Sequence, residues 1–117
     1  MPGSEEHLAW RSRRDVRLFL EENWGWWRHA ACRGMSTEAF FCDRGDWRCA
    51  REAQEVCARC PVSTCCLVYG MCERYGVWGG LTFRERRQLI PVWQRHGPVG
   101  LAMALRQRLD RLVHHSA

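Results

Sequence analysis

Lysine is absent from this chain of 117 residues, so all 18 basic side chains are arginine. A GC-rich coding sequence and a use for guanidinium groups, which grip phosphate in a bidentate manner, both explain this, and composition does not separate them. The sequence also lacks any apolar run approaching the roughly 20 residues of a membrane-spanning helix. Its first residues, MPGSEE, are acidic and do not resemble a secretory signal. We therefore expect a cytoplasmic protein without a membrane partner.

The sequence shows no convincing β-strand pattern, no internal repeat and no low-complexity segment. Its apolar residues recur instead at helical spacing. A chain of this length has room for one domain with a modest core. We therefore expect a small all-α fold of four to five helices: about 13–22, about 47–57, about 62–73, one that starts at Thr82, and one from Gly97-Pro98 to near His114.

Local signals mark the ends of these helices. Ser12 with Asp15, and Thr82 with Glu85, match the capping box that begins a helix. Pro91 is expected to kink or end the helix that starts at Thr82. The buried face of the last helix is predicted to consist of Leu101, Leu105, Leu109 and Leu112.

The positive charge is concentrated at one end of the chain. In residues 1–83 the arginines and the acidic residues balance, so the net charge of +5 lies in residues 84–117. Such asymmetry favours an anionic partner, either a nucleic acid or an acidic protein surface, although a solvated helix face is the simpler explanation. The candidate nucleic-acid-binding residues are Arg84, Arg86, Arg87, Arg106, Arg108 and Arg111.

Eight cysteines in a chain without a secretory signal indicate metal or redox chemistry rather than a disulfide framework. The Cys57-x-x-Cys60 pair can direct two sulfurs at one metal centre, and Pro61 follows it, as proline often follows a cluster ligand. Such a pair serves zinc, iron–sulfur and thioredoxin-like sites alike. Cys32 and Cys66 complete a set of four thiolates. The strand–helix–strand pattern of a thioredoxin-like site is missing.

Two aromatic segments accompany the cysteines. Trp24, Trp26 and Trp27 precede Cys32 and are expected either to shield a cofactor or to pack in the core. Gly76-Val77-Trp78-Gly79-Gly80 must form a turn, because glycines adopt backbone angles that other residues avoid. Trp78 is either a core residue or an aromatic anchor for a protein partner.

Several segments together resemble the bacterial WhiB-like family of transcriptional regulators, over roughly residues 24–88. The residues that carry the resemblance are Ala31-Cys32-Arg33-Gly34, Phe40-Phe41, Val56-Cys57-Ala58-Arg59-Cys60-Pro61, Cys66 and Tyr75-Gly76-Val77-Trp78-Gly79-Gly80-Leu81-Thr82. The resemblance implies a four-iron, four-sulfur (4Fe-4S) cluster, held by Cys32, Cys57, Cys60 and Cys66, that responds to oxygen and nitric oxide. It divides the chain into an N-terminal extension (1–23), a cluster-binding domain (24–88) and a basic tail (89–117).

The same resemblance implies the partners. Family members bind the promoter-recognition domain of the primary sigma factor with the cluster region and the glycine–tryptophan turn, here Gly76, Val77, Trp78, Gly79 and Gly80. Many also contact DNA through a basic C-terminal part. We therefore expect a regulator that is not an enzyme and has no small-molecule substrate. The alternatives are a protein disulfide reductase using Cys57 and Cys60, and a structural zinc module.

This chain departs from the family pattern in places. The segments between Cys32 and Cys57 and between Cys66 and Gly76 are short, and no glycine–arginine–proline hook for the minor groove is present, so DNA contact must use a helix surface. Cys65 is the runner-up to Cys66 as fourth ligand. Of the remaining cysteines, Cys49 and Cys72 are expected to pack as small apolar residues, whereas Cys42 and Cys65 are candidates for disulfides after cluster loss.

Overall fold

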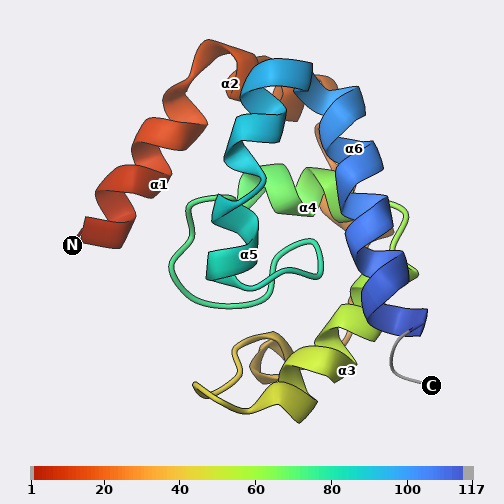
Figure 1. Cartoon of the computed structure of the whole chain (residues 1–117). Helices are drawn as coiled ribbons and strands as arrows, with labels where there is room; N and C mark the ends of the chain where they lie inside the picture. Colours follow the sequence, from red (N-terminus) through yellow and green to blue (C-terminus); the bar gives the residue numbers. More distant parts are fainter. Residues whose placement is uncertain (1, 115–117) are drawn as a thin grey trace.

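The computed structural model describes residues 2–114. Its helices are α1 (Pro2–Ser12), α2 (Arg14–Glu22), α3 (Trp47–Ala58), α4 (Ser63–Tyr69), α5 (Phe83–Arg87) and α6 (Ile90–His114), with two short 3-10 helices, η1 (Trp26–His29) and η2 (Thr37–Phe40). Over these residues the only β-type pairing is an isolated bridge between Trp78 and Leu81. The predicted all-α class is confirmed, with six α-helices rather than four or five (Figure 1).

The N-terminal region differs most from expectation, because it contains two helices instead of one. Ser12 does not cap the second helix, contrary to the prediction; its hydroxyl donates to the Leu8 carbonyl inside α1 (2.7 Å). Helix α1 was missed because it presents few apolar residues at helical spacing. It is held by tertiary contacts instead: the buried Trp10 donates its indole N–H to the Val68 carbonyl of α4 (2.7 Å).

The middle of the chain follows the sequence signals more closely. Helix α3 lies where it was predicted, and the Thr82–Glu85 capping box begins α5 as expected. Helix α4 ends at Tyr69, so it is shorter than predicted. The prediction for Pro91 was wrong: α5 has ended at Arg87, and Pro91 lies in the first turn of α6, where its missing N–H costs nothing.

Helix α6 is interrupted at Gly97, whose φ of 67° and ψ of −160° are not helical. The chain therefore rises to this point, turns, and descends as a long second segment (Figure 1). The predicted leucine stripe on that segment is confirmed, since Leu101, Leu105 and Leu109 are buried. They share one apolar core with residues of the other helices, which include Trp10, Val16, Leu67, Val68, Met71, Leu89 and Trp93. The segment of α6 that follows Gly97 is thus packed against the rest of the domain.

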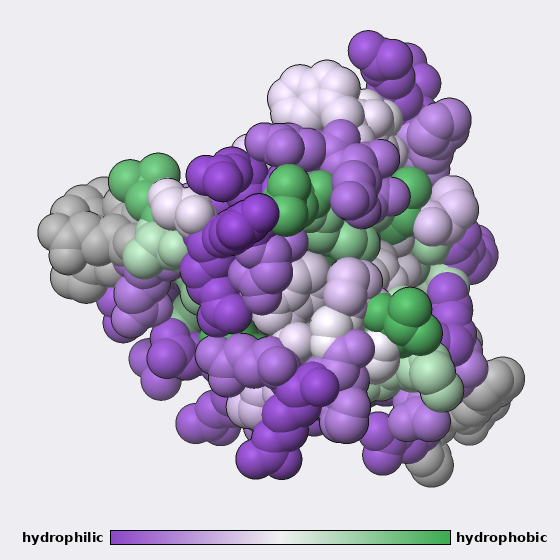
Figure 2. Space-filling view, turned by 90° about the horizontal axis from the view of Figure 1, so that it is seen from above, coloured by the Kyte–Doolittle hydropathy of each residue, from purple (hydrophilic) through white to green (hydrophobic). Residues whose placement is uncertain are grey.

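One face of the molecule is mainly polar. In the view from above, hydrophilic residues cover most of the face, and hydrophobic ones form small separate groups (Figure 2). No helix in the described part of the chain is long and apolar enough to cross a membrane.

Candidate metal centre

Four cysteines from three parts of the chain meet beside the core. Cys57 lies in the last turn of α3, Cys60 just beyond it, and Cys66 in α4. Cys32 comes from the loop between η1 and η2. The pKa of Cys57 is raised to about 12, first by burial and then by the proximity of the other three sulfurs. The structure therefore brings together the four cysteines that were predicted as ligands.

Backbone amides point at these sulfurs. The N–H of Ala31 donates to Cys60 Sγ (3.4 Å), and the N–H of Gly79 donates to Cys66 Sγ (3.3 Å). The Gly80 amide likewise donates to Cys57 and lowers its pKa against the effect of burial. Hydrogen bonds to sulfur stabilise the thiolate form that binds metal. Sequence reasoning did not foresee the amide at Ala31, because a backbone donor leaves no signature in residue type.

Cys66 fits this group better than its neighbour Cys65. The pKa of Cys66 is raised to about 12, first by burial and then by the nearby Cys32 and Cys60, and Cys66 in turn raises the pKa of Cys57. The pKa of Cys65 is also raised by burial, but Cys60 is the only other cysteine that affects it. Successive residues of a helix point about 100° apart, so only one of the two can face the group.

The donor set fits an iron–sulfur cluster. Four thiols with amide donors to three of them are a typical environment for such a cluster. As the side chains stand in the described residues, no group of three or more His, Cys, Asp or Glu is placed to hold a metal ion. Ligands of a multi-iron cluster bind separate iron atoms, so they need not approach one another as closely as the ligands of one ion do.

The Gly76–Gly80 segment forms a tight turn against the cysteines. Trp78 and Leu81 exchange two backbone hydrogen bonds across it, both 3.1 Å. Gly80 has a φ of +91°, and a Cβ there would lie 2.4 Å from Leu109 Cδ2 and 3.1 Å from Cys57 Cβ. Only glycine allows this backbone to sit between Leu109 of α6 and Cys57. The turn is therefore fixed beside the predicted metal centre.

Trp78 is half-buried, so the structure leaves both of its predicted roles open. Its ring lies against Gly70, where a Cβ would be 2.3 Å from Trp78 Cδ2. Its indole N–H donates to the Tyr75 carbonyl (2.9 Å). These contacts hold the ring in the fold, and its exposed part remains available to a partner.

A family model described as "Transcription factor WhiB" matches residues 26–89, more than half of the chain. The chain belongs to the WhiB family of transcription factors. The predicted resemblance is thereby confirmed.

Curated relatives agree with this assignment. The transcriptional regulator WhiD of Streptomyces coelicolor is 49% identical over 74 residues, which cover 57% of this chain and 66% of WhiD. The transcriptional regulator WhiB of the same organism is 44% identical over 71 residues, 59% of this chain and 79% of WhiB. The redox- and pH-responsive transcriptional regulator WhiB3 of Mycobacterium tuberculosis is 43% identical over 74 residues, 57% of this chain and 72% of WhiB3. The chain thus spans just under two thirds of WhiD.

The four surplus cysteines of this WhiB family member have different environments. Cys72 is buried in the core, as predicted for a small apolar side chain. Cys65 is buried and free. The prediction for Cys49 was wrong, because it is joined to Cys42 in a disulfide. Cys42 was expected as a disulfide candidate, but the identity of its partner came only from the fold.

Arg86 does not lie on a nucleic-acid-binding surface, contrary to our prediction. Its side chain is fully buried, and one guanidinium nitrogen donates to the carbonyls of Gly76 (2.8 Å) and Leu81 (2.6 Å). The second nitrogen donates to the Glu73 carbonyl. Burial lowers its pKa to about 10, so it stays charged at neutral pH. Arg86 therefore ties both ends of the glycine–tryptophan turn to α5, a role that a run of arginines in sequence does not reveal.

The other candidate arginines reach the surface. Arg84 is exposed, and Arg87 forms an ion pair with Glu6 of α1 (3.0 Å). Arg106 donates to the Ala58 carbonyl at the end of α3 (3.0 Å), and Arg108 donates to Gln88 (2.8 Å). The positive charge of α6 is thus partly engaged in contacts within the fold, although Arg111 is exposed.

The tryptophans before Cys32 do not pack in the core as a group. Trp24 is 75% exposed and Trp27 43% exposed, and their rings meet edge to face. Only Trp26 turns inward, towards Tyr69 of α4 (5.7 Å between ring centroids). A complete aromatic wall around the cysteines is therefore not formed by these three residues.

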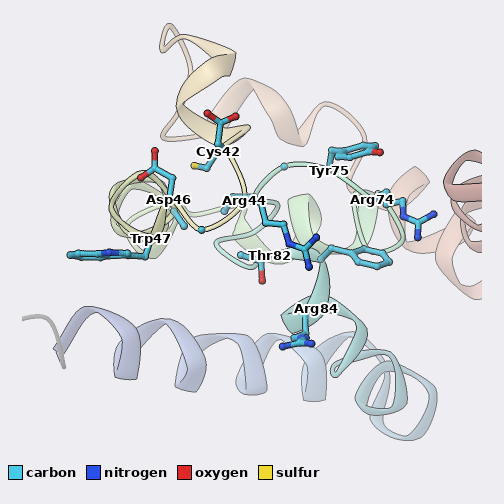
Figure 3. Close-up of a pocket in the computed structure, with 14 residues that line it drawn as sticks. Cys42, Arg44, Asp46, Trp47, Arg74, Tyr75, Thr82 and Arg84 are labelled. Atoms are coloured by element: carbon cyan, nitrogen blue, oxygen red, sulfur yellow. The ribbon is translucent and has the colours of Figure 1, made fainter.

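A groove of about 980 Å³ lies on the other side of the turn. Residues 42–47 form one wall, and residues 74–77 with the start of α5 form the other (Figure 3). Sequence reasoning missed this groove, because its walls are distant in sequence.

Proposed function

We propose that this WhiB family member is a redox- and nitric-oxide-responsive transcription regulator that holds one 4Fe-4S cluster through Cys32, Cys57, Cys60 and Cys66. The observation that supports this most directly is the convergence of these four sulfurs with backbone N–H donors directed at them. The cluster, when bound, supplies iron that reacts with oxygen and nitric oxide.

The protein's own part is to connect the sulfurs to the surface turn. The Gly79 N–H donates to Cys66 Sγ, and the Gly80 amide donates to Cys57. Hydrogen bonds to a charged acceptor are stronger than those to a neutral one. A change in the charge of these sulfurs therefore alters how firmly the Gly76–Gly80 turn is held, and the partner surface changes with it.

We further propose that the turn and its surroundings bind the promoter-recognition domain of the primary sigma factor, and that exposed arginines of α5 and α6 contact promoter DNA. The position of the turn beside the sulfurs supports the first proposal. The exposure of Arg84 and Arg111 supports the second. Phosphate contacts of this kind position a protein on DNA without reading its sequence.

Purification under anaerobic conditions tests the cluster. The sample is expected to be brown, with the broad visible absorption of a thiolate-bound cluster and about four iron and four sulfide per chain. The same sample, mixed with the sigma domain, is expected to co-elute with it on gel filtration. A colourless protein with one zinc per chain contradicts the proposal and identifies the zinc module instead.

Salt dependence tests the DNA contact. Replacing Arg106 and Arg111 with glutamine is expected to reduce the slope of log K against log salt by about 2, because each phosphate contact contributes about 0.9 to that slope. Fluorescence anisotropy with duplex DNA measures it. The matched control is Arg14→Gln with Arg17→Gln, which removes the same charge from α2 and should leave the slope near the wild-type value. If both pairs of substitutions give the same slope of log K against log salt, α6 does not contact DNA.

The structure does not favour a disulfide reductase. Such an enzyme needs an attacking cysteine whose pKa is low enough to give a thiolate near neutral pH. Burial instead raises the pKa of Cys57 to about 12. The Cys57 thiol is therefore poorly suited to attack a disulfide at neutral pH.

A further inference from the structure

The disulfide between Cys42 and Cys49 lies outside the predicted ligand set. Cys42 follows η2, and Cys49 lies in the first turn of α3. Their Cα atoms are 5.7 Å apart, within the range that a disulfide requires. Both residues are partly exposed, so small thiols can reach them. Neither cysteine is one of the four predicted ligands.

The two residues just before this disulfide, Phe40 and Phe41, also hold the glycine–tryptophan turn. The Phe40 carbonyl accepts the N–H of Val77 (2.7 Å), and the Phe40 side chain packs on Ala53, Cys57 and Val77. The ring of Phe41 lies over Gly76, where a Cβ would be 3.0 Å from it. Residues 36–46 are therefore a clamp on one side of the turn, which touches the ligand sulfurs on its other side.

Few other interactions fix this clamp. Residues 33–38 and 43–48 are exposed, and η2 is a single short 3-10 helix capped by Ser36. Segments with so few buried contacts open locally far more often than the core does. The covalent link to α3 is consequently a major constraint on the position of Phe40. It also constrains residues 42–47, which form one wall of the groove (Figure 3).

We propose that Cys42 and Cys49 form a reversible thiol–disulfide site, separate from the metal centre, whose redox state determines how firmly residues 36–46 hold the Gly76–Gly80 turn. Oxidised, the clamp is closed; reduced, it opens and loosens the Phe40–Val77 hydrogen bond. The co-reactant is a low-molecular-weight thiol and its disulfide. The proposal does not depend on the cluster.

The reduction balances as ordinary thiol–disulfide exchange. One thiolate attacks a sulfur of the pair, forming a mixed disulfide as the Cys42–Cys49 bond breaks, and the released cysteine takes up a proton. A second thiolate attacks the mixed disulfide, the second cysteine is released and protonated, and the small disulfide leaves. Two electrons and two protons pass from two small thiols to the protein.

Peptide mapping measures directly whether Cys42 and Cys49 are joined or free. Because lysine is absent, trypsin cuts only after arginine, and Cys42 and Cys49 fall on separate peptides, 34–44 and 49–51, with one cysteine each. Anaerobic protein is equilibrated with glutathione buffers of increasing oxidising strength, alkylated in denaturant and digested. We expect the linked pair of peptides in oxidising buffers, free alkylated peptides in reducing ones, and the same iron content in both.

Hydrogen exchange measures the consequence for the turn. Reduction is expected to speed exchange of the Val77 amide by about tenfold, as a local opening of the clamp requires. The variant with Cys42→Ser and Cys49→Ser should exchange at the reduced rate in every buffer. Cys72→Ala, which removes a free cysteine outside both sets, should keep the wild-type response.

Three results overturn the proposal. The first is a disulfide between Cys42 and a cysteine other than Cys49, and the second is a Cys42–Cys49 disulfide that forms only as iron is lost. The third is a hydrogen-exchange rate at the Val77 amide that does not change with the redox buffer. The proposed function fails by a different result, the absence of iron. In that case the peptide map and the exchange rates still report on this disulfide.

Discussion

Replacing Arg86 with methionine is expected to lower the free energy of unfolding by about 3–5 kcal/mol. The apolar side chain keeps much of the volume but leaves the part-buried carbonyls of Glu73 and Gly76 without a donor. The buried Leu81 carbonyl loses one of its two donors and keeps the Trp78 N–H. Each unsatisfied buried group costs about 1–3 kcal/mol. Urea unfolding of the anaerobic protein, followed by far-UV circular dichroism, measures the difference.

Two further variants make this result specific. Arg86→Lys keeps the charge but cannot present donors to three carbonyls as the planar guanidinium does, so an intermediate loss is expected. Arg84→Met removes an exposed arginine from the same helix and should change stability by less than about 0.5 kcal/mol. Equal losses for Arg84 and Arg86 would show that the buried hydrogen bonds contribute nothing of their own.

Replacing Cys66 with serine is expected to reduce bound iron at least about tenfold, because a ligand thiolate is lost from the centre. Its sulfur accepts the Gly79 N–H and is influenced by both Cys32 and Cys60. Cys65→Ser, on the adjacent residue, should retain the iron with only a modest loss of stability. Iron and sulfide analysis after anaerobic purification measures both.

The comparison between these neighbours decides the fourth ligand. Both residues lie in α4 and carry the same substitution, and the free energies of unfolding of the two variants show whether a difference in iron comes from ligation or from folding. Iron retained by Cys66→Ser and lost from Cys65→Ser would reverse the assignment. Loss from both would show that α4 itself must be intact for the centre to form.

The parts of the fold that the sequence predicted correctly depend on neighbouring residues. The capping box of Thr82 with Glu85 and the leucine stripe of α6 are patterns within one turn or one helix face, so a linear reading detects them. Helix α1 was missed because contacts such as that of Trp10 with Val68 stabilise it, and these join residues 58 positions apart. Pro91 was misjudged because a proline in a sequence can either end a helix or occupy the first turn of a new one, and the residue type does not separate the two.

The candidate site shows the same division. The family resemblance came from several short segments together, among them the Cys57 pair and the glycine–tryptophan turn, and each of these patterns lies within a few consecutive residues. The proximity of Cys32 to the pair, and the preference for Cys66 over Cys65, required the packing of α4 on the loop that carries Cys32.

By itself, the sequence determined that this protein is a small helical member of the WhiB family with four cysteines suited to one centre. Only the tertiary structure decided that Arg86 is a buried brace rather than a phosphate contact, and that Cys42 pairs with Cys49 beside the turn. The physical reason is that charge and thiol chemistry depend on surroundings. The sequence does not distinguish an arginine that is solvated from one that is buried among carbonyl groups, because the fold determines which of the two surroundings it has.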